Sequence, residues 1–253
     1  MRLLETILLT CFAAAALSAQ SPLTVLNGAR FEVQYPLAPG AYAQAYGLLE
    51  GVPTMLASSV PLPMELDGVR VLVDDVASPL LGIDRLVVSF LIPRATQPGR
   101  RTVKVVRGGA TLGQGTVDIV AVSPGLFYVL TDPLAQGGVI NEQNQFITPE
   151  TPARRGQAIQ IFGTGQGPID IGGEVPDNGV PPEGKLARAT RPTEVYISVE
   201  KAQVQFSGLS PQFPGLWQIN AIVPDKPYIR GRVPLTVTID GVPSNQVSFW
   251  VAE

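Results

Sequence analysis

The sequence contains no histidine, and its only cysteine is Cys11, near the N-terminus. Without histidine, a Ser-His-Asp triad and a histidine general base are excluded. A zinc site built from histidine and cysteine ligands is excluded for the same reason. Carboxylate chemistry, Ser-Lys chemistry and oxygen-ligated metals remain. If the N-terminal segment is removed, no disulfide can form, and the fold must depend on core packing.

Charged residues are also scarce, since they make up 15% of the chain and leave a net charge of −3. This balance gives no electrostatic reason to expect a nucleic acid or an anionic membrane as a partner. Hydrophobic residues, at 45%, are numerous enough to build a core, which excludes a disordered polymer.

Residues 1–19 have the three-part pattern of a secretory signal peptide. Arg2 supplies the positive charge, an apolar run extends from Ile7 to Leu17, and the small residues Ser18 and Ala19 offer a cleavage site. The alternative is a retained membrane anchor, but the run is shorter than the ~20 residues that span a bilayer. We therefore expect a secreted or cell-surface protein, extracellular or periplasmic, with no membrane span after signal cleavage.

Cys11 raises the further alternative of a lipoprotein signal. The segment Leu8-Leu9-Thr10 before it lacks a small residue next to the cysteine, and the apolar run continues past it. We therefore favour an ordinary signal peptide. Export without disulfides favours a bacterial source.

Short apolar runs with a period of two recur through the rest of the chain, which is the pattern of half-buried strands. They lie at residues 69–73, 102–105, 195–199, 235–239 and 247–251. The 24 prolines and 26 glycines are spread between such runs as turn signals. No window after the signal segment carries an apolar stripe of helical period. The sequence therefore predicts an all-β fold with almost no helix.

The two halves of the sequence repeat one pattern. The matched blocks are Gly40–Gly47 with Gly156–Gly163, Val69–Ile83 with Val195–Leu209, and Leu86–Pro93 with Trp217–Pro224. Within the first block, Gln44 falls on Gln160 and Tyr46 falls on Phe162. The period is about half of the mature length, which indicates a duplicated domain rather than a solenoid.

Each half contains roughly seven short strands separated by turns, the pattern of an immunoglobulin-like sandwich. We predict two tandem immunoglobulin-like β-sandwich domains related by internal duplication, at residues 22–124 and 125–253. Asp240-Gly241 is typical of a two-residue hairpin turn, and Gly108-Gly109 is its counterpart with a longer loop. Residues 137–147 are expected to form a hairpin of the second domain, and residues 168–191 a surface loop.

Several motifs resemble a known family. They are Asn27–Phe31, the Pro39-Gly40 start of a strand, Pro152–Gly156, Gly163–Pro168, Gly215–Asn220 and Ser244–Val247. Together they resemble the uncharacterised C-terminal domain family named for Solibacter, which occurs in secreted acidobacterial proteins, generally attached to larger extracellular chains. The resemblance covers essentially the whole mature chain, although residues 42–46 and 50–59 depart from it. It implies export and a pair of immunoglobulin-like sandwiches, and it implies no activity.

Candidate sites for chemistry are few. The run Gly163–Gly167 superficially resembles a phosphate-binding loop, but such a loop must open a helix. Pro168 and the residues after it are no helix start, so we interpret the run as a turn. A glycosidase needs two facing carboxylates. The candidates for such a pair are Asp74, Asp75, Asp84, Glu174 and Asp177.

These carboxylates also have a simpler interpretation as solvated loop charges. Asp74 and Asp75 are neighbours on a strand or at its end, so we expect them to point to opposite faces. Calcium could bind Asp74 with Asp75, or Asp177 with Asn178, but neither group matches a loop motif of defined spacing. We therefore predict no catalytic residue, no cofactor-binding residue and no metal site.

Three aromatic residues are candidates for a ligand or partner surface: Trp250, Tyr196 and Trp217. Trp250 is out of phase with its apolar neighbours, so we expect it on an outer face, alongside Tyr196 if their strands pair. An exposed patch of this kind could stack on a sugar ring or anchor a partner protein, with interdomain packing as the alternative. Trp217 lies on an apolar strand, where core packing competes with a role as a sugar platform.

The leading hypothesis is a secreted, non-enzymatic protein with a structural, adhesion or protein-interaction role at the cell surface. The alternative is a carbohydrate-binding module that uses exposed aromatics, and a carboxylate-based hydrolase is a third, less favoured interpretation. The partner would be an extracellular protein or a polysaccharide rather than a nucleic acid. Burial of Trp217 and Trp250 would remove the aromatic platform, whereas two converging carboxylates would support the hydrolase.

Overall fold

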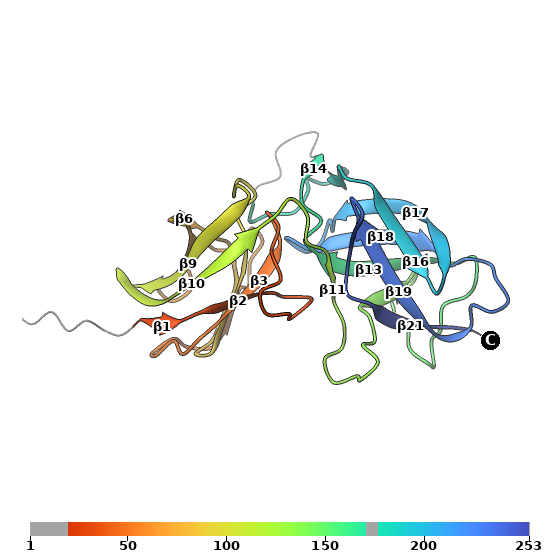
Figure 1. The fold of residues 1–253 in the computed structure, drawn as a ribbon, viewed down its shortest axis with the longest axis horizontal. Helices are drawn as coiled ribbons and strands as arrows, with labels where there is room; N and C mark the ends of the chain where they lie inside the picture. Colours follow the sequence, from red (N-terminus) through yellow and green to blue (C-terminus); the bar gives the residue numbers. More distant parts are fainter. Residues whose placement is uncertain (1–19, 171–176, 253) are drawn as a thin grey trace, which may run out of the picture.

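The computed structural model describes residues 20–170 and 177–252, and this part of the chain forms strands, turns and loops but no helix. No helix that could span a membrane therefore occurs among these residues. Two β-structures lie one after the other along the long axis, with β1 (Ser21–Pro22) at one end and the C-terminus at the other (Figure 1). The all-β prediction is confirmed.

Two five-stranded sheets form the first β-structure. In spatial order, one sheet contains β1, β10 (Ala110–Ile119), β9 (Gly99–Arg107), β5 (Val69–Val73) and β6 (Val76–Ala77). The other contains β2 (Thr24–Asn27), β3 (Tyr42–Tyr46), β8 (Val87–Leu91), β7 (Leu80–Ile83) and β4 (Met55–Leu56). All pairs are antiparallel except β1 with β10. Antiparallel sheets that share one apolar core make an immunoglobulin-like sandwich.

The second β-structure is one continuous path of strands that forms both of its layers. The path contains β11 (Gly125–Leu126), β13 (Ala158–Thr164), β18 (Trp217–Ile222), β17 (Glu200–Leu209), β16 (Thr193–Ile197), β19 (Gly231–Ile239) and β20 (Val242–Pro243). Four more strands flank it: β12 (Val139–Asn141), β14 (Ile169–Asp170), β15 (Arg188–Ala189) and β21 (Val247–Val251). A bulge between Val204 and Phe206 bends β17, so its first residues pair with β16 and its later residues with β18.

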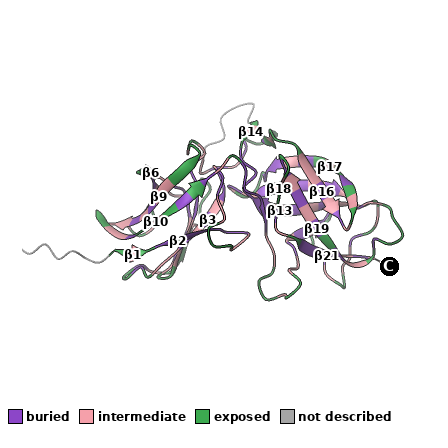
Figure 2. Ribbon diagram, in the orientation of Figure 1, coloured by how far each residue is buried: buried purple, intermediate pink, exposed green. Residues whose placement is uncertain are grey.

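The alternating runs place their apolar side chains in two separate clusters. The first cluster draws on residues 23–119 and joins Val71 and Val105 of one sheet with Ala43 and Phe90 of the other, all fully buried. The second draws on residues 122–251. Figure 2 shows buried and exposed residues alternating along the strands. Because each fully buried large apolar side chain contributes about 1.5–3 kcal/mol, packing of this extent supports a fold that lacks disulfides.

The same pairing scheme occurs in both halves. In the first half β3 pairs with β8 and β8 with β7, while β9 pairs with β5 and β10. In the second half β13 pairs with β18 and β18 with β17, while β19 pairs with β16 and β21. The sequence blocks that we matched therefore fall on corresponding strands. Descent of the two halves from one duplicated domain stays a prediction.

The hairpin turns follow the sequence with one difference. Asp240 and Gly241 have φ of +52° and +78° and connect β19 to β20, as the Asp-Gly signal predicts. Gly108-Gly109 also forms a two-residue turn, because Arg107 pairs directly with Ala110. The longer loop that we expected there is absent. Around residues 137–147 the predicted hairpin forms, with Ile140 bridged to Phe146.

The two sandwiches meet in a contact region that we call the joint. Its residues include Asn27, Tyr42, Leu62, Leu91 and Arg94 on one side and Ser123, Phe127, Thr164, Asp177, Asn178 and Gly215 on the other. The backbone N–H of Tyr42 donates to Thr164 Oγ1 at 2.7 Å, and Asn27 Nδ2 donates to the Ser123 carbonyl at 3.1 Å. Asn27 and Thr164 are fully buried. Since an unpaired buried polar group costs about 1–3 kcal/mol, these bonds favour one docked arrangement.

The predicted surface loop at residues 168–191 takes part in the joint. The backbone N–H of Leu62 donates to the Asn178 carbonyl at 2.7 Å, and Asn178 Nδ2 donates to the Leu62 carbonyl at 2.9 Å. Asp177 accepts from the backbone N–H of Arg94 at 3.1 Å, and its carboxylate lies 3.9 Å from the guanidinium. The segment around Asp177 and Asn178, which belongs to the second half of the chain, is therefore hydrogen-bonded to the first sandwich.

Candidate functional site

Trp217, named above as a candidate for the ligand surface, lies in the core of the second sandwich. Its side chain is 0% exposed. The indole Nε1–H donates to Ser207 Oγ at 2.9 Å, which satisfies the polar atom that burial would otherwise leave unpaired. A ligand cannot reach this ring, so the structure places Trp217 in core packing.

Trp250 points outward from β21, as its phase predicts, but its ring is only half exposed. The guanidinium of Arg232 lies over the ring, 5.8 Å from its centroid. Arg232 also donates to Asp132 Oδ2 at 2.7 Å and to Ser248 Oγ at 2.9 Å. The ring is therefore covered by a cation that the chain itself holds in place.

Tyr196 does not join Trp250 in one patch, because β16 and β21 do not pair with each other. Both flank β19, where Tyr196 lies opposite Thr236 and Trp250 opposite Arg232. Four residues of strand separate these positions, about 13 Å along β19. The Tyr196 hydroxyl donates to Glu194 at 2.8 Å, and this bond is the main reason that the pKa of Tyr196 is raised.

The contact between Arg232 and Asp132 predicts a pH effect. The hydrogen bond from Arg232 holds the pKa of Asp132 below its usual value, with a smaller effect from the Leu134 backbone N–H. A lowered folded-state pKa stabilises the protein above the unfolded pKa of about 3.9, and this stabilisation is lost as pH falls through the folded pKa. In an Arg232→Gln variant, we expect the NMR titration midpoint of Asp132 to rise toward 3.9. An unchanged midpoint would contradict this account, and Arg191→Gln serves as a control.

The candidate carboxylates are each engaged locally. Asp74 accepts from the Thr102 backbone N–H at 2.8 Å and pairs with Arg101, while Asp75 pairs with Lys104 at 2.9 Å. Both occupy the turn between β5 and β6. Asp84 accepts from Thr54 and from the Leu86 backbone N–H, and Asp177 belongs to the joint. Glu174 lies outside the described residues. Among residues 20–170 and 177–252, no three acidic side chains gather where they could hold a metal ion.

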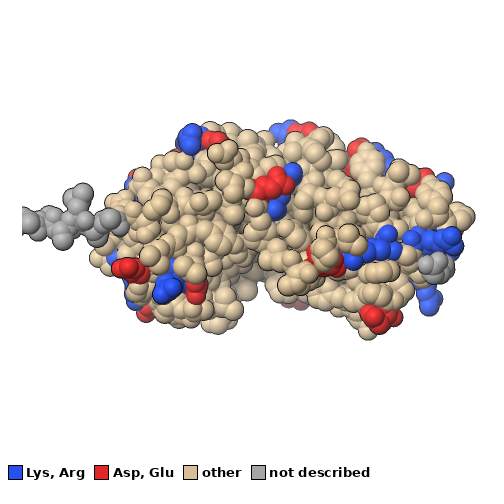
Figure 3. All heavy atoms as spheres, turned by 60° about the horizontal axis from the view of Figure 1, so that its bottom comes forward, with Lys and Arg blue, Asp and Glu red and all other residues tan. Residues whose placement is uncertain are grey.

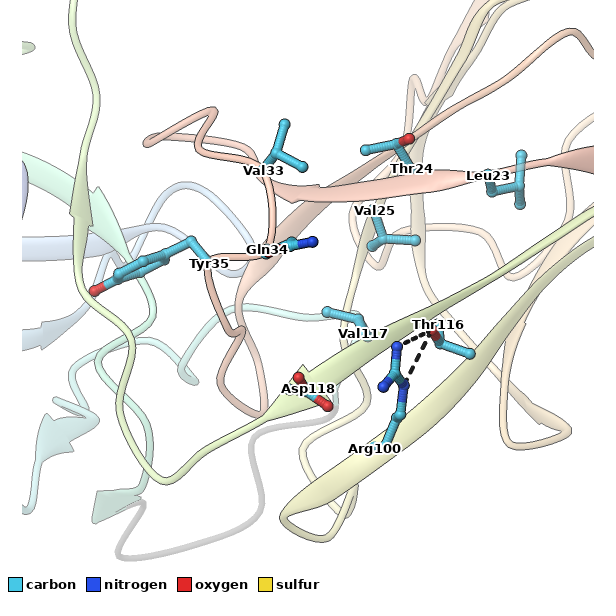
Figure 4. A pocket seen from close by; sticks show the side chains of 10 residues that line it. All are labelled: Leu23, Thr24, Val25, Val33, Gln34, Tyr35, Arg100, Thr116, Val117 and Asp118. Atoms are coloured by element: carbon cyan, nitrogen blue, oxygen red, sulfur yellow. Dashed lines mark hydrogen bonds between the residues drawn. The ribbon is translucent and has the colours of Figure 1, made fainter.

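A hollow of about 490 Å³ opens between β2 and β10 (Figure 4). On the edge of β10 that faces away from β9, β1 pairs with Gly113 and Gln114, and Leu37 bridges to Ile119. The hollow lies between these two contacts. Gln34 points into the hollow, whereas Tyr35 points away from it. The Arg100 guanidinium donates to Thr116 Oγ1 at 3.2 and 3.3 Å and is therefore already engaged. The hollow is a gap at a sheet edge rather than a built ligand site.

A more organised arrangement covers the outer face of the β2-β3-β8-β7-β4 sheet. On β3, Ala43 and Ala45 are buried, so Tyr42, Gln44 and Tyr46 point outward. Gln44 Nε2 donates to the Tyr42 hydroxyl and to Ser89 Oγ, both at 3.3 Å. The Tyr46 hydroxyl donates to Gln44 Oε1 at 2.8 Å, and the Tyr42 hydroxyl donates to Ser89 Oγ at 3.2 Å. This network fixes one amide between two phenol rings.

The second sandwich carries a similar network on the outer face of β13 and β18. Gln218 Nε2 donates to Gln160 Oε1 and to Asn220 Oδ1, both at 3.0 Å. Gln160 Nε2 in turn donates to Asn144 Oδ1 at 3.3 Å. Phe162 lies on the same face, since it alternates with buried Ile161 and Gly163. Here too the amide side chains are held by one another.

Phe127 connects the two networks across the joint. Its ring packs edge-on against Tyr42, with the centroids 5.7 Å apart. Its backbone N–H donates to the Phe162 carbonyl at 3.0 Å. Phe127 follows buried Leu126, so the alternation of the chain directs it to the side of Phe162. Phe127 therefore links the two outer faces, through a ring contact with Tyr42 and a backbone hydrogen bond to Phe162.

We call this surface the amide face. It consists of Tyr42, Gln44, Tyr46 and Ser89, the bridging Phe127, and Gln160, Phe162, Gln218 and Asn220. None of these side chains carries a charge at neutral pH. In Figure 3, charged side chains form small groups separated by wide uncharged areas. The molecule therefore offers no strong electrostatic field for an ionic partner on the face displayed.

The sequence contained part of the signal for this face. Gln44 and Gln160 hold corresponding places in the repeated blocks, each followed two residues later by an aromatic residue. The pairing partners Ser89 and Asn220 also hold corresponding places, opposite Gln44 and Gln160. The sequence signal for the amide face is this uncharged repeat, to which neither tryptophan candidate for the ligand surface belongs as an exposed group.

Comparison with known proteins gives no family. No protein-family model and no curated protein sequence matches the chain. Among solved structures, it is similar to SGBP-B of the Bacteroides ovatus mixed-linkage glucan utilization locus, solved with a mixed-linkage heptasaccharide. That similarity has 13% identity and a TM-score of 0.36 over 87% of this chain and 43% of that one.

Two further structures show weaker likeness. The Escherichia coli adhesin FdeC has 10% identity and a TM-score of 0.26 over 92% of this chain and 64% of that one. Domains 5–6 of the S-layer protein SbsC have 14% identity and a TM-score of 0.27 over 91% and 96% of the two chains. The chain thus spans less than two thirds of the length of SGBP-B and FdeC. Similarities this low transfer no function to it.

Proposed function

We propose that this protein is a secreted, non-enzymatic module with a structural, adhesion or interaction role at the cell surface. The signal-like segment at residues 1–19 supports export. The engaged state of the candidate carboxylates favours a binding or structural role over hydrolysis. We include in the proposal the relation to the family named for Solibacter, which the motifs from Asn27 to Val247 suggest, and the origin of the two halves by duplication.

The joint is the observation that carries this proposal. An enzyme needs a cleft that gathers reactive groups, whereas an adhesive or structural module needs a shape that is maintained under load. Here buried side chains, backbone hydrogen bonds and the Asn178 segment fasten one sandwich to the other. This fixed arrangement keeps the outer faces of both sandwiches in one continuous surface.

Localisation tests the first part of the proposal. The full chain with a C-terminal epitope should be processed near Ala19 and should be found in the medium or be accessible to antibody on intact producing cells. Protein that stays unprocessed in the cytoplasm would refute an extracellular role. A variant with Leu8 and Leu9 replaced by aspartate is the matched control, since it breaks the apolar run that export requires.

Adhesion tests the second part. Beads coated with residues 20–253 should attach to envelopes of the producing cells more strongly than beads coated with an unrelated immunoglobulin-like domain. We expect attachment to persist at high salt, because the surface is poor in charge. Equal attachment of both bead types would contradict an adhesive role even if the protein is exported.

A further inference from the structure

We propose that the amide face binds a neutral polysaccharide chain that lies across the joint and contacts both sandwiches. This inference rests on the proposed surface role and names the chemistry of its partner. It differs from the aromatic patch considered in the sequence, because Trp217 is buried and Trp250 is covered by Arg232.

The free hydrogen-bonding capacity of the face suits sugar hydroxyls. Gln44 uses both of its N–H groups, and Ser89 accepts from Gln44 and Tyr42, so among residues 20–170 and 177–252 the Ser89 O–H has no acceptor and can donate to a ligand. Gln218 uses both of its N–H groups, which leaves its carbonyl oxygen and the Asn220 NH₂ group unpaired within the described part of the chain. Each sandwich thus offers fixed neutral groups, and a sugar hydroxyl can both donate and accept.

The internal hydrogen bonds reduce the entropic cost of binding. A free glutamine or asparagine side chain loses conformational freedom when a ligand immobilises it, which weakens binding. Gln44, Gln160 and Gln218 are already held by their neighbours. The side chains of the amide face are therefore already ordered before a ligand binds. A sheet surface that contacts only solvent has no need of such ordered side chains.

Half-buried aromatic rings supply apolar contact beside these polar groups. Tyr42 lies directly on Gly28, where an added Cβ would come within 1.9 Å of ring carbon Cδ1. Its hydroxyl bonds and the ring contact with Phe127 hold it in place. Tyr46 and Phe162 hold corresponding positions in the two halves. Such rings combine an apolar body with adjacent polar groups, the combination that a sugar ring with its C–H face and hydroxyls requires.

The dimensions favour a chain over a single sugar. Tyr42 to Tyr46 covers about 13 Å of β3, and Gln160 to Phe162 adds about 7 Å on β13. Thr164 at the end of β13 accepts a hydrogen bond from the backbone N–H of Tyr42 at the start of β3, so the two strands meet at the joint. Contacts in both sandwiches act together on one chain, because the second contact forms at a high effective concentration.

The absence of charge selects a neutral ligand. A nucleic acid or an acidic polysaccharide would be attracted by lysine and arginine side chains, and the amide face contains neither. Arg188, at the border, lies over the Phe206 ring at 5.2 Å. A protein partner would be expected to cover large exposed apolar side chains, and those of the described residues, such as Leu56, Leu130 and Phe146, are not members of the amide face.

Affinity electrophoresis with residues 20–253 tests the inference. Native gels would contain one neutral polymer each, a β-glucan, a xylan, a mannan or starch, with alginate as the anionic comparison. We expect at least one neutral polymer to retard the protein and alginate to leave it unretarded. Ser89→Ala and Asn220→Ala should each weaken retardation at least tenfold, and the double variant should abolish it. Gln114→Ala, an exposed amide on β10 of the other sheet, is the matched control.

Each result decides the question. Thermal unfolding of the variants must match the unchanged chain, which separates loss of binding from loss of fold. The inference is overturned if no neutral polymer retards the protein, if alginate is preferred, or if retardation survives in the double variant. If envelope adhesion is lost in the double variant without any retardation by polysaccharide, the face belongs to a protein partner instead. Export and adhesion could then still hold.

Discussion

A Trp217→Ala variant should lose about 3–5 kcal/mol of unfolding free energy, the range for removing a large buried aromatic side chain. The residue is fully buried within the second apolar cluster. Its removal leaves a cavity beside Gly163, whose position lies within about van der Waals contact of the indole. The substitution also removes the hydrogen bond that the indole Nε1–H donates to Ser207 Oγ. Urea denaturation followed by circular dichroism measures this loss.

Trp250→Ala is the internal control for the first prediction. Its ring lies at the border of the cluster, so we expect a loss well below that of Trp217→Ala, through contacts with Arg232. Losses of similar size in the two variants would contradict the placement of Trp217 in the core. Polysaccharide retardation should persist in Trp250→Ala, since Trp250 lies outside the amide face.

Gly165→Ala is expected to loosen the joint. Gly165 has φ of +82°, and an added Cβ would come within 1.9 Å of the Ser123 carbonyl oxygen. The segment around Ser123 connects the two apolar clusters, and we call it the linker. The positive φ costs about 1–2 kcal/mol for alanine, and the steric conflict with the linker adds about 1–3 kcal/mol. The hydrogen bond from the Ser123 N–H to the Gly165 carbonyl, at 2.8 Å, should weaken as the linker moves. Small-angle X-ray scattering should show a more variable arrangement of the two sandwiches.

Gly156→Ala separates the two costs. Gly156 has a similar φ of +78°, but an added Cβ there meets no atom within 4 Å. We therefore expect only the backbone cost of about 1–2 kcal/mol and unchanged scattering. If Gly165→Ala behaved like Gly156→Ala in both measurements, the close approach of the linker would not determine the joint.

The strands were predictable because the period of two is a local property of the sequence. Val69 to Val73 and Val195 to Ile197 alternate clearly, and the structure buries their inward side chains. The prediction was wrong at Val199, which is 81% exposed in the turn between β16 and β17 instead of continuing the strand. The Asp240-Gly241 turn was predictable for the same reason, since its conformation depends on the two residues themselves. Local patterns of this kind determined the fold class.

Contacts between distant segments were not predictable from one sequence. Nothing around Asn178 indicates that it bonds to Leu62, because that contact depends on how two folded sandwiches dock. The partners of Trp250 depend on the order of β16, β19 and β21, which alternation does not determine. The sequence indicates part of the amide face, because Gln44 and Gln160 hold corresponding positions. It does not indicate that the two parts form one surface, because that depends on the contact between Tyr42 and Phe127.

The positions of the two ends of the described chain determine how the joint would carry tension. Ser21 and Ala252 belong to opposite ends of the long axis (Figure 1). Tension applied between these ends would pass from one sandwich to the other through the joint. The hydrogen bonds of Asn27, Thr164 and Asn178 cross the joint beside the covalent chain, so we expect them to share that tension. If the proposed surface role holds, we expect the molecule to resist stretching at the joint, where two sandwiches connected only by a flexible chain would separate first.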